Sequence, residues 1–463
     1  MVVVLERRAR VLDDGAVLLG GAPPRMLHLS PAAQTRLVGR RLTVTDATSA
    51  ALARRLIDAG IAHPVAEPAD VVPTPSAVTV VIPVKDRTDG VARLLAALAA
   101  EPGTGRVIVV DDGSADPDAV RQVAERAGAD VVRHPSPQGP AAARNAGLAA
   151  ATTPLVAFLD SDVLPEPGWL PTLLSRLADP AVGLVAPRIV ALPPVTGWLG
   201  RYEAVRSSLD LGPDPALIVP RSRVAYVPSA ALLVRRVAVG AGFDADMHVA
   251  EDVDLVLRLH AAGWRLRYEP AARVAHDHRT TLRAWWLRKA FYGTGAAPLA
   301  LRHPGAVPPM VLSPTAAAMS VLLLLGRPVT ALGVGAVAAQ RLSRKLTRLR
   351  RPRTTAARLI GLAAVGAAAQ TADAVTRHYW PLAALAALVS RRARRTVAAV
   401  AIGSALVDWY RAGPERPPLS AFLLARRLDD LAYGAGLWWG AATHRTLEPL
   451  RPVGPTERAS PKD

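Results

Sequence analysis

The pattern of apolar and polar positions changes twice along this 463-residue chain. Over the first 68 residues, short apolar runs alternate with signals for turns and helix caps. Asp14-Gly15 lies between two apolar runs and predicts a hairpin, while Ser30-Pro31 and Asp46 each predict the start of a helix. The Pro-rich residues 69–76 indicate a linker. We therefore predict a small α+β module at residues 1–68.

From residue 77, continuous apolar runs alternate with helical patterns. Residues 78–83, 106–110 and 155–159 are nearly free of polar side chains, which is typical of strands buried on both faces of a parallel sheet. Such alternation predicts an α/β fold with an open, mostly parallel sheet and flanking helices over residues 77–303. In these sheets, ligands bind at the carboxyl ends of the strands.

From residue 304, the pattern is helical and rich in alanine and leucine. The uncharged residues 304–326 are long enough to cross a bilayer, although they contain three internal prolines. Basic clusters at 341–351 and 391–395 follow apolar stretches directly, as anionic headgroups and cytoplasmic flanks favour. An alanine-rich soluble bundle is the alternative. We predict that residues 304–463 form a membrane-associated helical region at the cytoplasmic face of the cell membrane.

The amino-acid composition excludes some classes of protein and favours some classes of partner. Hydrophobic residues make up 51% of the chain, which excludes a disordered protein. The sequence has no cysteine, which excludes disulfides and thiolate metal sites. Its 56 Lys and Arg against 38 Asp and Glu give a net charge of +18, which favours nucleotide phosphates, anionic lipid or nucleic acid as partners. No signal peptide opens the chain, so we expect the catalytic part to face the cytoplasm.

Acidic residues follow the predicted strands at their carboxyl ends. Asp111 and Asp112 precede the tight turn Gly113-Ser114, where an acid can accept hydrogen bonds from a nucleobase or a ribose; a capped turn explains them equally well. Asp160 and Asp162 are two positions apart on an extended segment, so both face the same side. Paired carboxylates of this kind favour Mg²⁺ or Mn²⁺ held against a polyphosphate.

Residues on the predicted helices and on a later strand complete the candidate site. Arg144 lies on the helix before the acidic strand and can pair with a diphosphate or with the acids; an exposed helix arginine is the alternative. Asp252 stands near a helix start, where it suits a general base or a first-turn acid. His276 and His278 share one side of a short strand and offer a further metal ligand.

These features, in this order, resemble the family 2 glycosyltransferases of GT-A fold over residues 77–302. The resemblance rests on five segments: Val80-Val-Ile-Pro-Val, Val110-Asp-Asp-Gly-Ser, Ala143-Arg-Asn-Ala-Gly, Leu159-Asp-Ser-Asp and Glu251-Asp252. It implies that Asp252, beside Glu251, is the catalytic base of an inverting transfer. It places the donor nucleotide against Pro83, Asp111, Asp112, Arg144 and Asp160, the metal on Asp162 and His276, and the leaving group near Arg288 and Lys289.

The layout of the whole chain is similar to one subgroup of that family, the mycofactocin-system glycosyltransferases. This likeness rests on the leading segment from Leu12-Asp-Asp-Gly to Ile61-Ala-His-Pro and on Arg288-Lys-Ala-Phe-Tyr-Gly-Thr-Gly. The leading unit is also similar to the winged-helix, PqqD-like modules that bind precursor peptides, so a peptide or a partner protein is expected there. The resemblance implies transfer of glucose from UDP-glucose to a redox cofactor made from a peptide.

Other functions fit parts of the same pattern. A family 2 transferase that builds a cell-envelope polysaccharide or a glycolipid would share every motif above. A sugar nucleotidyltransferase also uses an α/β sheet with metal-bound acids, but it carries a Gly-rich loop after the first strand, where this chain has Pro83-Val-Lys-Asp-Arg. A nucleic-acid-binding surface would fit the charge of +18, yet basic clusters beside apolar helices fit a membrane surface at least as well.

Overall fold

Short strands and two helices form the amino-terminal part of the computed structural model, which describes residues 1–65, 73–279 and 281–455. The predicted hairpin is confirmed, because β2 (Arg10–Leu12) and β3 (Val17–Gly20) pair antiparallel, and β4 (Arg25–His28) extends them. A second sheet has the order β5-β6-β1-β7. Its strands are β1 (Val2–Leu5), β5 (Leu37–Val38), β6 (Arg41–Thr43) and β7 (Ala62–Pro64).

Both predicted helix starts of this module are confirmed. Helix α1 (Pro31–Arg36) begins after Ser30, whose hydroxyl accepts a hydrogen bond from the Ala33 amide. Helix α2 (Ala47–Asp58) begins after Asp46, which exchanges hydrogen bonds with Ser49 as a capping box. Of the predicted linker 69–76, residues 69–72 lie outside the described residues.

A nine-stranded mixed sheet forms the centre of the next part of the chain, with the order β10-β9-β8-β11-β15-β13-β16-β12 and β14 paired to β16. The four strands β10, β9, β8 and β11 are parallel, as expected. Beyond them the sheet is mixed, since β15 runs antiparallel to both of its neighbours. The strands are β8 (Val78–Val84), β9 (Val107–Asp112), β10 (Asp130–His134), β11 (Leu155–Leu159), β12 (Val163–Pro165), β13 (Val182–Ala191), β14 (Ala216–Leu217), β15 (Ala231–Arg235) and β16 (Arg265–His276).

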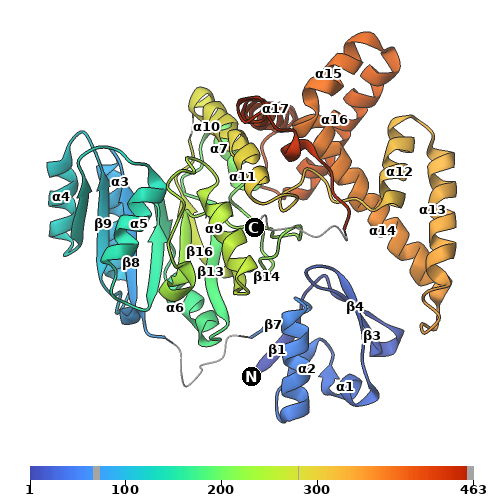
Figure 1. Cartoon of the computed structure of the whole chain (residues 1–463), viewed down its shortest axis with the longest axis horizontal. Helices are drawn as coiled ribbons and strands as arrows, with labels where there is room; N and C mark the ends of the chain where they lie inside the picture. Colours follow the sequence, from blue (N-terminus) through green and yellow to red (C-terminus); the bar gives the residue numbers. More distant parts are fainter. Residues whose placement is uncertain (66–72, 280, 456–463) are drawn as a thin grey trace. The chain divides into compact units, whose positions relative to one another are not determined.

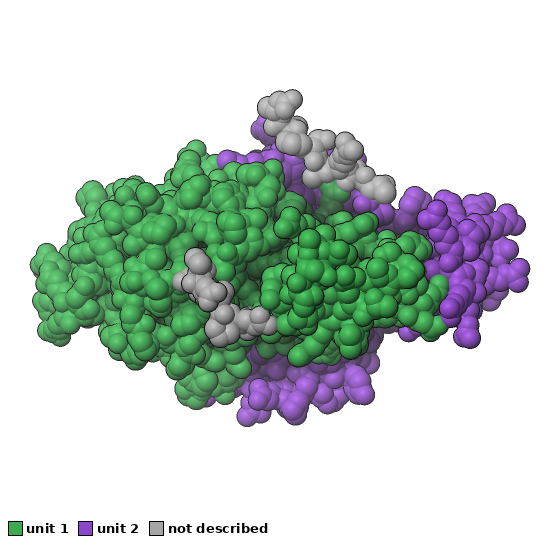
Figure 2. Space-filling view, turned by 90° about the horizontal axis from the view of Figure 1, so that it is seen from below, with its two compact units in different colours: residues 1–195, 207–278 green, residues 196–206, 279–463 purple. Residues whose placement is uncertain are grey.

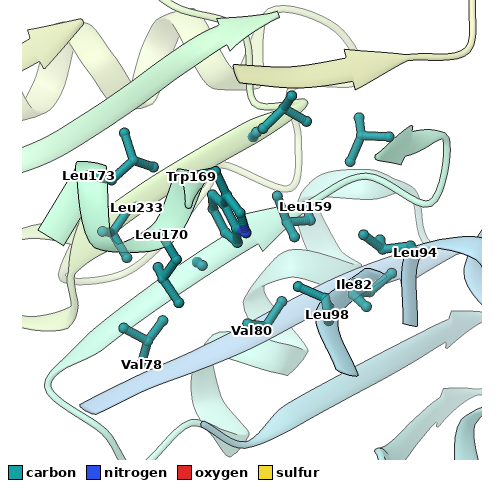
Figure 3. Packing of buried hydrophobic residues seen from close by; sticks show 14 of the residues in the cluster. Val78, Val80, Ile82, Leu94, Leu98, Leu159, Trp169, Leu170, Leu173 and Leu233 are labelled. Atoms are coloured by element: carbon teal, nitrogen blue, oxygen red, sulfur yellow. The ribbon is translucent and has the colours of Figure 1, made fainter. Parts of the chain in front are cut away.

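Helices cover both faces of this sheet (Figure 1). On one face, side chains of β8, β11 and β15 pack against α3 and α6 around the buried Trp169, as Figure 3 shows. On the other face, Phe158 and Leu232 pack with Leu148 of α5 and Leu255 of α9. The helices are α3 (Thr88–Ala100), α4 (Pro117–Arg126), α5 (Pro140–Ala150), α6 (Trp169–Leu174), α8 (Arg236–Val239) and α9 (Glu251–Ala261).

The remaining elements are helical. Helices α10 and α17 touch backbone to backbone, because a Cβ on Gly436 would overlap the Ala290 carbonyl oxygen. The helices are α7 (Gly197–Arg206), α10 (Leu282–Thr294), α11 (Ala296–Arg302), α12 (Pro314–Leu324), α13 (Pro328–Ser343), α14 (Pro352–Asp373), η4 (Ala374–His378), α15 (Trp380–Val389), α16 (Arg391–Arg411) and α17 (Leu419–Thr443).

The chain divides into two units, coloured separately in Figure 2. Unit 1 contains Met1–Val195 and Ser207–His278, and unit 2 contains Thr196–Arg206 and Arg279–Asp463. The domain boundaries read from the sequence, at residues 68 and 303, stay predictions.

Residues 304–326 do not form the single long helix that crossing a bilayer would need. Helix α12 starts only at Pro314 and has 11 residues, about 16 Å against a hydrocarbon core of about 30 Å. Residues 303–313 are not helical, and among them Pro308 and Pro309 lack the amide donors that a helix needs. In the described part of the chain, one helix is long and apolar enough to cross a membrane, Pro352–His378.

Candidate active site

The register of the parallel strands brings the acidic residues to one edge of the sheet. Val84 pairs with Asp111, and Val81 pairs with Phe158, so β8, β9 and β11 end at nearly the same level. Asp111 and Asp112 close β9, and Asp160 and Asp162 follow β11 directly. Pro83 lies in β8 opposite Val110 and is half-buried. The acidic residues therefore lie together at the carboxyl ends of these strands, as predicted.

Asp112 holds the loop that precedes α5. Its two carboxylate oxygens accept hydrogen bonds from the backbone amides of Gln138 and Gly139, each 2.8 Å long. The ring Nδ1 of His134 lies 2.8 Å from the same carboxylate. Asp111 is also buried and accepts a 2.9 Å hydrogen bond from the Ser114 amide. Both acids hold the loops at this edge of the sheet, and their contact with a base or ribose stays a prediction.

Gly113 lets the turn after β9 pass close to a neighbouring loop. Its φ is +71°, and a Cβ there would lie 2.7 Å from the ring of Pro137. The next residue, Ser114, accepts a 3.0 Å hydrogen bond from the Asp86 amide, and Asp86 in turn accepts one from the Ala115 amide at 2.7 Å. The loops after β8 and β9 are thus fastened to each other.

Arg144 lies buried between two acidic residues, with 3% of its surface exposed. Its guanidinium donates a 2.6 Å hydrogen bond to Asp160 and a 3.0 Å hydrogen bond to Glu251. The ring of Phe243 packs 5.3 Å from the guanidinium carbon. The exposed-arginine alternative is excluded, and of the two functional expectations the structure shows pairing with the acids. Arg144 thus connects Asp160, after β11, to Glu251 at the start of α9.

Asp252 lies in the first turn of α9, next to the Glu251–Arg144 pair. Its carboxylate accepts hydrogen bonds from the Ser229 amide at 3.0 Å and from the Val253 amide at 2.8 Å. Burial, together with the negative charge of Glu251, raises the pKa of Asp252 to about 6. A carboxylate with that pKa is ionised at neutral pH and is a stronger base than an ordinary aspartate. These properties suit general-base chemistry.

Asp162 and His276 face each other across the β12–β16 pairing. Val163, directly after Asp162, pairs with His276, and this register leaves the Asp162 Oδ1 3.6 Å from the His276 Nε2. The guanidinium of Arg87 lies 3.4 Å from the other oxygen of Asp162, and the His278 ring lies 3.3 Å from the His276 ring nitrogen.

The Asp162 and His276 atoms suit two adjacent corners of a metal coordination sphere, since ligands about 2.1 Å from an octahedral ion lie about 3 Å apart. Within residues 1–65, 73–279 and 281–455, no group of three or more acidic or histidine side chains could hold a metal. Any ion here would need further ligands from water or a substrate.

Arg288 and Lys289 lie in α10 of unit 2. The Lys289 ammonium is buried, 3.0 Å from a Glu203 carboxylate oxygen and 3.9 Å from one of Asp429. The Arg288 guanidinium packs near the rings of Phe291 and Tyr292. These contacts give Lys289 a structural part inside unit 2, and the leaving-group role of both residues stays a prediction.

Three contributors to the site escaped the sequence analysis. Arg87 pairs with Asp162, Ser229 supplies a backbone amide to Asp252, and Phe243 packs on Arg144. Asn145, beside Arg144 in the sequence, holds the Phe243 backbone through both a donated and an accepted hydrogen bond. In the sequence, only the adjacent Arg144-Asn145 pair pointed to these contacts. Arg87, Ser229 and Phe243 reach the site through tertiary folding alone.

Comparison with known proteins identifies relatives of this chain. The model of the family described as glycosyl transferase family 2 matches residues 79–238. The pre-mycofactocin glycosyltransferase of Mycobacterium tuberculosis is 49% identical over 465 residues, which cover 97% of each chain.

Two solved structures resemble the chain more distantly. One is the mannosyltransferase PcManGT from Pyrobaculum calidifontis in complex with GDP-Man and Mn²⁺, with 23% identity over 65% of this chain and 89% of that chain and a TM-score of 0.39. The other is the glucosyl-3-phosphoglycerate synthase from Mycobacterium tuberculosis, with 21% identity over 48% of this chain and 78% of that chain and a TM-score of 0.34.

Proposed function

The chain belongs to glycosyl transferase family 2, and from this premise we propose that it transfers a hexose, glucose, from a UDP-sugar to a hydroxyl group of a pre-mycofactocin acceptor. The predicted enzyme class, a glycosyltransferase, and the predicted GT-A fold are confirmed. The acceptor class is supported by the 49% identity with the enzyme of that name. The chemistry is supported by Asp252, whose raised pKa and backbone hydrogen bonds suit a base.

In the proposed mechanism, Asp252 removes the proton from the acceptor hydroxyl while its oxygen attacks the anomeric carbon of the donor. The bond between that carbon and the diphosphate breaks in the same displacement, so the sugar configuration inverts. The backbone amides of Ser229 and Val253 fix the carboxylate before the substrate arrives. Arg144 holds Glu251, which keeps the neighbouring negative charge in place.

Donor binding is assigned to the sheet edge that Pro83, Asp111, Asp112 and Asp160 share. A divalent cation, Mg²⁺ or Mn²⁺, would be held by Asp162 and His276, and it would supply positive charge against the diphosphate. The guanidinium of Arg87, which pairs with Asp162, would add a second positive charge near the diphosphate.

The amino-terminal module is the proposed contact for a peptide or a partner protein, which would bring the acceptor to the enzyme. The cytoplasmic face of the cell membrane is the proposed location. No nucleic acid is required for this reaction.

Donor and acceptor assays test the proposal. The purified chain is incubated with UDP-glucose and, separately, with UDP-galactose, UDP-N-acetylglucosamine and GDP-mannose, with peptide-derived acceptor and Mg²⁺ or Mn²⁺. The expected products are UDP and a glucosylated acceptor. In a parallel incubation with added pyrophosphate, formation of UTP and sugar 1-phosphate would instead indicate a nucleotidyltransferase. Transfer only to lipid or polysaccharide acceptors would refute the acceptor class while leaving the glycosyltransferase activity intact.

A further inference from the structure

Helix α15 of unit 2 is apolar throughout, and it contacts α16 and η4 without fully burying any of its side chains. Its ten residues, Trp380–Val389, include no buried side chain. Leu382, Leu385 and Leu388 recur every three residues, so they share one face of the helix, and all three are exposed. At the end of the helix, Leu388 and Val389 are 79% and 80% exposed. Exposed leucines and valines at this density mark a contact surface.

Helices α15 and α16 form one helical hairpin of unit 2, and α12 and α13 form another; the turn of the first contacts the turn of the second. The side chain of Arg392, at the start of α16, donates a hydrogen bond to the Leu325 carbonyl at the end of α12. Leu325 and Val329, on either side of the α12–α13 turn, are also exposed, at 52% and 81%. This contact links two turns that are more than 60 residues apart in the sequence, and both carry exposed apolar side chains, which we call the apolar patch; Figure 1 shows the two hairpins.

Four arginines follow α15 closely in the sequence. Arg391, Arg392, Arg394 and Arg395 occupy the first turns of α16, and all are exposed. Cations at a helix amino terminus oppose the helix dipole, so these residues do not serve the stability of α16. Between residues 304 and 407 the sequence has 14 Lys and Arg and one acidic residue, Asp373. The charge at the patch therefore suits an anionic partner with an apolar interior.

We propose that the tip surface, meaning the exposed face of α15, the turn 325–329 and Arg391–Arg395, docks on an anionic lipid bilayer. Helix α15 is about 15 Å long, half of the hydrocarbon core, so it lies in the interface and does not cross it. Its leucines enter the acyl boundary, while the arginines contact lipid phosphates. This mode differs from a bilayer crossing by residues 352–378.

Flotation of the full-length protein with vesicles tests the proposal. One set of vesicles contains phosphatidylcholine and phosphatidylglycerol in equal parts, and the other contains phosphatidylcholine alone. An apolar variant carries Leu388→Gln and Val389→Gln, and a charge variant carries Arg391→Gln and Arg395→Gln. Matched controls change equally exposed residues of unit 1: Val38→Gln with Val237→Gln, and Arg54→Gln with Arg55→Gln. Circular dichroism and UDP release in solution check that each variant is folded.

We expect binding to the anionic vesicles only, with high salt weakening it. Each arginine near such a surface contributes about fivefold in affinity, so the charge variant should lose about 25-fold. The apolar variant should lose binding, and both controls should keep it. The proposal is overturned if anionic vesicles are not bound, or if the tip variants bind like their controls. It is also overturned if membranes from expressing cells release the protein only with detergent and not with salt or alkaline wash, or if the tip leucines instead support a dimer in sedimentation velocity.

Discussion

The raised pKa of Asp252 makes the stability of the protein depend on pH in a way that one substitution should remove. The pKa of about 6 compares with 3.8 for an unperturbed aspartate. A difference of about 2 units corresponds to about 3 kcal/mol between the two protonation states. Because the folded-state pKa is the higher one, the folded state prefers the protonated acid. The wild-type protein therefore loses about 3 kcal/mol of stability as the pH rises from about 4 to above 6.

Asp252→Asn removes this titration. Asparagine keeps one oxygen acceptor for the Ser229 or Val253 amide and loses the second hydrogen bond, a cost of about 1 kcal/mol that does not change with pH. The unfolding free energy of the variant, relative to the wild type, should thus rise by about 3 kcal/mol between pH 4 and pH 7. Turnover should fall about 10²- to 10⁴-fold, while donor binding is retained.

Denaturant unfolding of both proteins between pH 4 and pH 7.5 measures the difference, with UDP release and binding of the UDP-sugar measured alongside. The matched control is Asp246→Asn, an exposed aspartate in the loop before α9. The control should show neither the pH-dependent difference nor the loss of turnover. A difference between wild type and Asp252→Asn that is constant across this pH range would refute the argument from burial. Normal turnover by the Asp252→Asn variant would refute the assignment of the base.

Three further changes probe the rest of the site. Arg144→Gln leaves Asp160 and Glu251 without their buried cation and should cost about 3–5 kcal/mol in unfolding free energy; because Arg144 also lowers the pKa of Asp252, the acidic limb of the pH–rate profile should move to higher pH. Gly113→Ala combines a φ of +71° with a contact to Pro137, so we expect a cost of about 1–3 kcal/mol and a higher KM for the donor, checked by thermal melting and initial rates. His276→Ala should raise the Mn²⁺ concentration for half-maximal activity by about tenfold or more, equivalent to about 1.4 kcal/mol, whereas an unchanged metal titration would exclude His276 as a ligand.

The sequence alone determined the elements whose physical cause is local. The hairpin at Asp14-Gly15 and the helix starts at Ser30 and Asp46 depend on turn and cap chemistry within a few residues, and all three form as predicted. The parallel strands β8, β9 and β11 follow from continuous apolar runs, which can only be buried on both faces. Strands of this kind end at a common edge, so the placement of Asp111 and Asp160 was also predictable.

Tertiary structure decided what depends on distant pairing. Register between β12 and β16 brings Asp162 to His276, and the fold around Arg144 joins Asp160 to Glu251, although more than 90 residues separate the last two. The length of residues 304–326 allowed a bilayer crossing despite three internal prolines, and only the fold shows that the helix in this stretch is limited to residues 314–324. The exposure of the apolar side chains of α15 could not be predicted either, since a sequence of leucines and alanines does not specify whether other elements cover it. Burial is a property of the assembled fold, and only the fold could decide it.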